Sequence, residues 1–562
     1  MSSPAKRIKL DTITSELQKC RLTKAEDITK FNFNMKRTQL LCGDKKSVKT
    51  TGRGGILYYM RRDQRIQDNW ALLFAQKLAL ENKLKLSILT GTDKNWEVQR
   101  EATRRYLEFT VGGLKEVAEE AKDLNIGFHY LSNFTSKKLA EFVVEHDVNC
   151  LVVDFSPLRK PLRIVEKIKN AMEEMENKPV LYQVDAHNIV PIWETSEKQE
   201  YAARTIRRKI MDKLSSYLTE FPPVTRHPYG DENQEGTNHT SKLVNWESIL
   251  SNTECCEKVK PVSWAQPGSI AGFEMLESFV EKRLKIYATK RNDPNAKALS
   301  NLSPWFHFGH LSAQRAVLYV KKHGKSYSES VSGFVEESVV RRELSDNFCF
   351  YNDKYDSIEG ASQWAQDTLK QHNADKREYV YTLKEFNSAR THDDLWNAAQ
   401  LQLITEGKLH GFMRMYWAKK ILEWTESAEQ ALEFSLIFND RYSLDGADPN
   451  GFVGCMWSVA GIHDQGWKER EVFGKIRFMN YAGCKRKFDI GSYIRRYGGK
   501  VHTKNGKSDS KKAMDKLFSK KESKKEPMKE LKKEPMKEPM KESTKEPIKN
   551  PKNEKKLKTE KN

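Results

Sequence analysis

Short apolar runs alternate with helical patterns over the first third of the chain. The apolar runs occupy residues 56–60, 84–89, 126–131, 150–155 and 180–185. Between them lie segments such as GGLKEVAEEAKDL at 112–124, in which apolar residues recur at helical spacing. Strands and helices in alternation predict a doubly wound parallel sheet, and we place this α/β domain at residues 54–187.

Beyond residue 269 the pattern becomes mainly helical, with GFEMLESFVEKRL as an example. We predict a second, all-α domain over residues 269–497. The stretch between the two domains, residues 188–268, is irregular, and the composition of PPVTRHPYGDENQEGTNHT at 222–240 indicates a loop or linker. No GxGxxG or P-loop motif follows the first strand, which excludes an ordinary nucleotide site there.

Both ends of the chain are polar. Residues 1–53 lack clear periodicity, and residues 498–562 are rich in Lys and repeat KKEPMKE. Neither segment buries enough apolar surface to fold alone, so we expect disordered termini. The tail is either a DNA- or RNA-tethering arm, a second import signal or a solvated extension. PAKRIKLD at 4–11 resembles a nuclear import sequence, which favours the nucleus over a merely solvated terminus.

The net charge of +20 is shared between the tail and the rest of the chain, because residues 501–562 hold 21 Lys and 11 acidic residues. The remainder is only mildly basic, which is compatible with phosphate contacts without requiring them. The eight cysteines show no CxxC pair, which favours reduced thiols in the cytosol or nucleus. No apolar run has the length needed to span a bilayer, and no signal peptide is evident.

Tryptophans are concentrated in residues 391–424, at Trp396, Trp417 and Trp424. On a helix, Trp417 and Trp424 would lie on one face, two turns and about 10 Å apart. That spacing suits the passage of an electron between indoles. The alternative is an amphipathic helix whose aromatic residues simply fill a core.

Two other segments have the composition of a binding site. Residues 439–488 are dense in Gly, Trp, Asp and Asn, with little regular apolar periodicity. Glycine permits close backbone approach and Asp or Asn shapes turns, so such a stretch usually builds a site. In residues 287–315, the turn SNLSP presents hydroxyls and backbone N–H groups that suit a phosphate at a helix start.

Together, these segments and YYMRRDQRIQDNWAL at 58–72 resemble the class II branch of the DNA photolyases. The resemblance covers residues 54–497, and RMYWAKKILEW and DPNG are its most specific markers. It implies a lyase that splits cyclobutane pyrimidine dimers with light and reduced FAD, while the protein supplies position and electrostatics. The alternative from another class is a cryptochrome-like photoreceptor that retains the flavin and has lost repair.

The resemblance also implies roles for particular residues. The expected flavin-binding residues are Tyr287, Ser300, Asn301, Leu302, Ser303, Arg414, Asn439 and Asp445. Of these, Arg414 and Asp445 would form an ion pair beside the flavin ring, and Asn439 would face its N5 side. The expected electron relay consists of Trp417, Trp424 and Trp396, with Tyr381 as an auxiliary donor.

On the substrate side the resemblance implies that Glu337 hydrogen-bonds the bases of the dimer, although the adjacent Glu336 is an alternative. Other photolyase branches carry a Trp three residues after this acid, where this chain has Val340. The remaining substrate-side candidates are Met415, Trp457 and Arg477. Met415 and Trp457 would stack on the dimer, and Arg477 would fill the hole left in the duplex or grip its backbone.

The expected partner is double-stranded DNA that contains pyrimidine dimers, and the expected state is a monomer. In this family the first domain can hold a light-harvesting antenna, often a deazaflavin or a folate. His307 and His310 stand at i and i+3 and could share a metal, but no third ligand is evident, so ordinary packed or surface histidines are favoured.

Overall fold

We describe the fold from a computed structural model, which covers residues 15–24, 28–44, 54–93, 103–176, 179–230 and 244–498. The import-like segment at 4–11 and the Lys-rich tail lie outside these residues. No helix among the described residues is long and apolar enough to cross a membrane. None of the eight cysteines forms a disulfide in the described part of the chain.

The N-terminal part contains a six-stranded sheet in the order β1-β6-β5-β2-β3-β4. The five predicted apolar runs all form strands and pair in parallel: β2 (Ile56–Tyr59), β3 (Leu86–Asp93), β4 (Gly127–Phe134), β5 (Cys150–Asp154) and β6 (Val180–Val184). The sixth strand, β1 (Thr38–Cys42), pairs antiparallel with β6 in a register that places Thr38 opposite Val184. The sheet therefore begins inside the segment that the sequence analysis assigns to a disordered extension.

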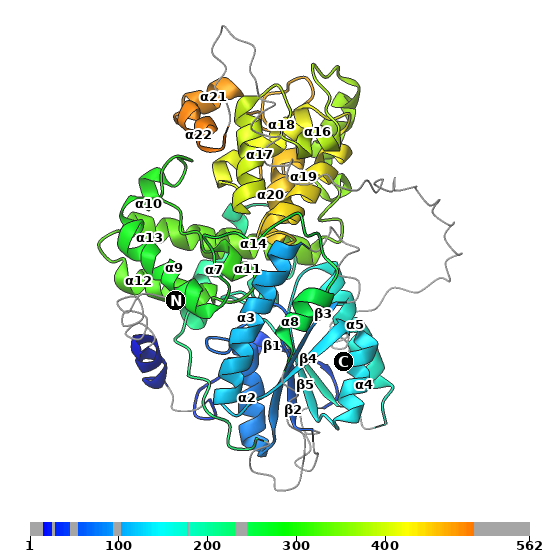
Figure 1. Cartoon of the computed structure of the whole chain (residues 1–562), viewed down its shortest axis with the longest axis vertical. Helices are drawn as coiled ribbons and strands as arrows, with labels where there is room; N and C mark the ends of the chain where they lie inside the picture. Colours follow the sequence, from blue (N-terminus) through cyan, green and yellow to red (C-terminus); the bar gives the residue numbers. More distant parts are fainter. Residues whose placement is uncertain are drawn as a thin grey trace, which may run out of the picture. The chain divides into compact units, whose positions relative to one another are not determined.

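Helices cover both faces of the sheet (Figure 1). Side chains of α2 (Trp70–Asn82) and α3 (Arg104–Asp123) pack with Ile56 and Tyr58 on one face. Side chains of α4 (Ser136–Glu145) and α5 (Arg159–Glu173) pack with Leu57 and Tyr59 on the other. Alternate residues of β2 thus serve two separate cores, which confirms the predicted doubly wound architecture.

The stretch expected to be a linker, residues 188–268, contains regular structure. It forms α6 (Ile192–Thr195), α7 (Ala203–Tyr217) and α8 (Trp246–Asn252). In α7 the apolar side chains at Ile206, Ile210 and Leu214 recur every four residues and are buried in a core shared with later helices. The linker assignment is therefore wrong for α7, because an amphipathic helix of this length buries a full stripe of side chains.

The rest of the described chain is helical, as predicted. Its helices are α9 (Ser269–Lys282), α10 (Leu284–Lys290), α11 (Ser303–His307), α12 (Ala313–His323), α13 (Ser328–Val335), α14 (Arg342–Tyr351), α15 (Gln363–Gln371), α16 (Leu383–Asn387), α17 (Asp394–Glu406), α18 (Gly411–Glu423), α19 (Ala428–Tyr442), α20 (Pro449–Ala460), α21 (Tyr481–Lys485) and α22 (Ile490–Arg496). A π-helical turn, η5 (Glu336–Arg341), joins α13 to α14. Such turns are rare and frequently lie at functional sites.

The segment after β2, residues 61–69, joins the sheet to the helices. Arg62 donates two hydrogen bonds to the Asp346 carboxylate of α14, at 2.8 and 3.0 Å, and both side chains are buried. Arg65 donates to the carbonyl oxygen of Gly309 at 2.7 Å. Gly309 has φ +69°, and a Cβ there would lie 2.3 Å from the Arg62 carbonyl oxygen, so only glycine fits.

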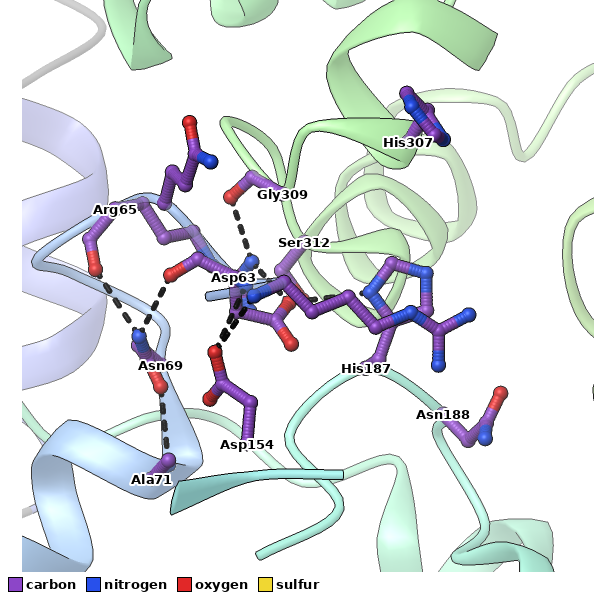
Figure 2. A network of polar contacts seen from close by, with 12 residues as sticks. Asp63, Arg65, Asn69, Ala71, Asp154, His187, Asn188, His307, Gly309 and Ser312 are labelled. Atoms are coloured by element: carbon purple, nitrogen blue, oxygen red, sulfur yellow. Dashed lines mark hydrogen bonds and ion pairs between the residues drawn. The ribbon is translucent and has the colours of Figure 1, made fainter. Parts of the chain in front are cut away.

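The same segment is held from the sheet side by one carboxylate. Asp154, at the end of β5, accepts the backbone N–H groups of Arg61 and Arg62 at 2.8 Å and of Asp63 at 3.2 Å. The Asp63 carboxylate in turn contacts the ring of His187 at 3.2 Å (Figure 2). Side chains and backbone groups of this stretch therefore tie the end of strand β2 to β5, to the loop that contains His187 and to the helical part.

Candidate active site

A line of buried aromatic residues runs through the helical part. The Trp417 ring lies on α18, and its indole N–H donates to Gln400 Oε1 on α17 at 2.8 Å. Trp396, also on α17, donates its indole N–H to the backbone oxygen of Trp417 at 2.9 Å. The Trp396 ring stands edge-on to the Trp424 ring with centroids 6.2 Å apart. All three indoles are almost completely buried.

Tyr381 extends this line towards the surface. Its ring is edge-on to Trp424 at 5.9 Å, and its backbone N–H donates to the Trp424 carbonyl oxygen at 3.0 Å. The contacts therefore give the order Trp417, Trp396, Trp424, Tyr381. The helical spacing of Trp417 and Trp424 suggested a direct step between them, but Trp424 is the C-cap of α18 and the ring that contacts it comes from α17.

A second cluster forms where α18, α19 and α20 meet. A guanidinium nitrogen of Arg414 lies 3.9 Å from Asp445 Oδ1, and that buried oxygen has no hydrogen-bond partner among the described residues. Asn439 is buried on α19 and donates from Nδ2 to Asp440 Oδ1 at 2.9 Å. A Cβ at Gly451 of α20 would lie 2.7 Å from Asn439 Nδ2, so this glycine lets the two helices approach.

Lys408 is a member of this cluster that sequence reasoning missed. Burial lowers the pKa of Lys408 to about 8, while Asp445 raises it and Arg414 and Arg283 lower it. Arg283 reaches the carbonyl oxygen of Ser300 at 3.5 Å, and its buried Nε has no hydrogen-bond partner. The three cations Lys408, Arg414 and Arg283 outnumber the two carboxylates Asp445 and Glu406 that act on Lys408, and this excess of positive charge suits an anionic ligand. A single lysine among many gave no signal in the sequence.

The predicted phosphate-binding turn lies beside Arg283. In this turn Ser300 and Ser303 are partly exposed, Leu302 is buried, and Asn301 has φ +61°. Tyr287 is buried on α10, where its ring packs edge-on against Phe279 at 5.3 Å and burial raises its pKa to about 12.

The two acids on the π-helical turn, Glu336 and Glu337, differ in their partners and in their exposure. Glu336 accepts from Arg207 at 2.8 Å and from Arg341 at 2.9 Å. Burial alone would raise the pKa of Glu336, but these two hydrogen bonds bring it below its ordinary value. Glu337 has half of its side chain exposed, and its nearest ion-pair partner is Arg291 at 3.7 Å. Of the two acids, Glu337 is the one available to a ligand.

Of the other substrate-side candidates, Arg477 lies against Trp457. The Arg477 guanidinium lies 5.5 Å from the Trp457 ring and 4.1 Å from the Trp467 ring, and it donates to Asp464 at 3.0 and 3.3 Å. Beneath them, the buried Lys419 Nζ lies 5.0 Å from the Trp457 ring. Met415 is partly buried on α18. No recorded contact between described residues links Glu337 to this group, so the structure brings together Trp457 and Arg477 only.

The two histidines considered as metal ligands have other partners. The His307 ring contacts the Asp448 carboxylate at 3.0 Å, and Tyr106 at 3.2 Å. His310 is fully buried, accepts the Gly268 N–H at Nδ1, and has a pKa lowered by burial to about 3. The described residues contain no cluster of three or more metal-ligating side chains.

Comparison with known proteins defines the class. The family model for DNA photolyase matches residues 56–226. The chain is 52% identical over 480 residues to the deoxyribodipyrimidine photo-lyase of Potorous tridactylus, which covers 85% of this chain and 88% of that protein. The chain therefore belongs to the DNA photolyase family.

More distant proteins extend the similarity. The chain is 45% identical over 463 residues to the deoxyribodipyrimidine photo-lyase of Oryza sativa subsp. japonica, covering 80% of this chain and 90% of that one. Among solved structures, a class III photolyase from Agrobacterium tumefaciens superposes with a TM-score of 0.63 at 16% identity, over 80% of this chain and 87% of that chain. A Synechocystis cryptochrome gives 0.61 at 15% identity, over 79% and 88%. At these identities the two structures share the fold, and they do not distinguish repair from signalling.

Proposed function

We propose that this chain is a class II photolyase that repairs cyclobutane pyrimidine dimers in double-stranded DNA by light-driven electron transfer from reduced FAD. The single observation that carries the proposal is the juxtaposition of the aromatic line with the cluster around Arg414 and Asp445, both on or beside α18. Similarity over most of the chain to deoxyribodipyrimidine photo-lyases supports the same conclusion.

The residues around Arg414 fit a flavin. A buried Asp445 oxygen without a hydrogen-bond partner and an excess of cations from Arg414, Lys408 and Arg283 suit a ring that carries both N–H donors and an anionic edge. Asn439 would present its amide to the ring from α19. The diphosphate would lie against Arg283 and the turn formed by Ser300, Asn301, Leu302 and Ser303, with Tyr287 beside it. When bound, reduced FAD supplies the light-excited electron that opens the cyclobutane ring.

The aromatic line would resupply electrons to the site. Trp417 is the innermost member and shares α18 with Arg414. Trp396 connects it to Trp424, and Tyr381 is the outermost member. The three indoles are buried, and hydrogen bonds from the indole N–H groups of Trp396 and Trp417 hold those two rings in place.

The lesion would be turned out of the duplex, where its weakened pairing lowers the cost of unstacking. Glu337 would hydrogen-bond its bases and stabilise the developing negative charge. Met415 and Trp457 would contact the pyrimidines, and Arg477 would contact the DNA backbone or the gap in the duplex. A monomer that acts in the nucleus, and a deazaflavin or folate antenna in the first domain, stay predictions.

The experiment is illumination of the purified, FAD-loaded protein with an oligonucleotide that contains one cyclobutane dimer. Restoration of the intact strand in light, and its absence in the dark, is the expected result. Flavin that is reduced by light without any repair of the dimer would instead favour the cryptochrome-like alternative.

A further inference from the structure

The outer end of the aromatic line contains a histidine that the photolyase resemblance did not bring in. The Tyr381 hydroxyl lies 2.7 Å from His392 Nδ1, and the His392 ring is edge-on to Trp424 at 4.8 Å. The Tyr379 ring stacks on this imidazole, with centroids 3.7 Å apart. The rings of Tyr381 and His392 therefore both contact Trp424, the outermost indole of the line.

Two hydrogen bonds join Tyr381 to His392, and one tautomer of the imidazole makes the phenol the donor. The backbone N–H of His392 donates to the Tyr381 oxygen at 3.0 Å. When the imidazole carries its proton on Nε2, the Tyr381 hydroxyl donates to Nδ1, and the backbone N–H and Nδ1 then use different sites of the phenol group. A neutral imidazole with a lone pair on Nδ1 completes this arrangement.

The surroundings keep the imidazole neutral near pH 7. Burial lowers the pKa of His392 below its ordinary value, and Lys420 lowers it further, whereas Asp393 and Glu378 raise it. The Asp393 carboxylate is engaged elsewhere, since it accepts from the Tyr416 hydroxyl and from the Trp396 backbone N–H. The net effect leaves His392 able to accept a proton.

We propose that His392 is the proton acceptor for Tyr381, which makes the last step of the electron relay a coupled transfer of an electron and a proton. The step rests on the proposed relay. When Trp424 has lost an electron to the inner tryptophans, the Tyr381 ring gives one electron to the Trp424 radical cation. The hydroxyl proton moves from the Tyr381 oxygen to His392 Nδ1. The products are neutral Trp424, a neutral tyrosyl radical and a protonated imidazole.

The proton transfer to His392 favours electron transfer from Tyr381 to Trp424 over the reverse step. A phenol that loses an electron and keeps its proton becomes a strong acid, so an acceptor at hydrogen-bond distance removes the unfavourable intermediate. The side chain of His392 is itself exposed to solvent, so the proton has a route out of the protein. The oxidised end of the line then rests at the surface as a neutral radical that a solution reductant can reach.

The test is flash photolysis of the full-length protein with oxidised FAD bound, following the tryptophan and tyrosyl radical bands over time. In the parent protein the tyrosyl band should grow as the tryptophan band decays, and more slowly in D2O. His392→Phe keeps the ring and its stacking but lacks a base, so tyrosyl formation should slow on the order of a hundredfold. His392→Asn keeps a hydrogen-bond acceptor without a base and should be equally slow.

The parent protein alone provides a second arm that requires no substitution. As the pH falls through the pKa of His392, which lies below that of an ordinary histidine, the imidazole becomes protonated and the tyrosyl yield should fall. Tyr379→Phe is the matched control, because it preserves the stacked ring and the acceptor and should behave as the parent does.

Three results would count against the assignment. Parent-like tyrosyl formation in His392→Phe would overturn it. Fast formation in His392→Asn, with slow formation in His392→Phe, would reduce His392 to a residue that only positions the phenol, and would overturn the proton transfer as well. If no tryptophan radical forms even in the parent protein, the relay itself is wrong, and this inference with it.

Discussion

Replacement of Lys419 by Met should raise the stability of the protein at pH 6, in a way that disappears at alkaline pH. Lys419 lies under Trp457 in the helical part, with no exposed side-chain surface, and its ammonium donates to the Ser458 carbonyl oxygen at 3.0 Å. Burial lowers its pKa to about 7, with Asp464 raising it and Arg477 lowering it further.

The sign follows from proton linkage. An unfolded lysine has a pKa of about 10.4, so between about pH 7 and 10 the unfolded chain binds more protons than the folded protein, and stability rises with pH. Below about pH 7 the folded protein carries the full cost of a buried charge, about 4–5 kcal/mol relative to the neutral amine. The hydrogen bond and the cation–π contact of Lys419 stabilise the folded protein by about 1 kcal/mol each and offset part of this cost.

The difference predicts that Lys419→Met gains about 2 kcal/mol at pH 6, falling to about zero near pH 9. Urea unfolding of the parent and the variant at several pH values measures it, with Lys485→Met as a control for the loss of an exposed lysine. The reasoning would be refuted by a variant that is less stable than the parent at pH 6, or by a stability difference that does not change between pH 7 and 9.

Four further outcomes follow from the structure and the proposed function. Trp396→Phe should block photoreduction of bound flavin as completely as a substitution at Trp417. The control is Trp305→Phe, which removes a buried tryptophan outside the line and should leave photoreduction intact. The rate of flavin reduction under steady light measures the effect of each substitution. Arg62→Met should destabilise the protein by about 3–5 kcal/mol in urea unfolding, since it leaves Asp346 buried without its charged partner. Deleting residues 501–562 should reduce the salt dependence of DNA binding, measured by titration, because fewer counterions are released. Side by side under illumination, the cyclobutane dimer should be repaired and the (6-4) photoproduct should not.

The parallel sheet could be predicted because its inner strands β2, β5 and β6 are buried at every position and therefore are largely apolar in sequence. Strand β1 could not, since its residues alternate between partly exposed and exposed until Cys42, as befits an edge strand in a polar context. Helix α7 did carry a helical stripe, and the irregular composition of the residues after it obscured that signal.

The residues of the candidate site could be predicted from the sequence, but the contacts between them could not. Resemblance supplied Trp396 as a relay member, but its place between Trp417 and Trp424 depends on how α17 packs on α18, which no local pattern encodes. The π-helical turn that separates Glu336 from Glu337 inserts one residue into the helical repeat, and periodicity cannot register it. Lys408 and Lys419 were missed because burial of a lysine is a tertiary property.

The two interpretations of the tryptophan-rich segment, core packing and electron passage, do not exclude each other. Trp396, Trp417 and Trp424 belong to one buried hydrophobic core. Each of the first two also uses its indole N–H in a hydrogen bond that ties α17 to α18, so packing fixes the distances that a relay requires. The distinguishing feature lies at the outer end, where a core needs no phenol hydroxyl at 2.7 Å from an imidazole. Tryptophan radicals after a flash therefore test whether the line passes electrons at all, and replacing His392 tests whether its outer end also passes a proton.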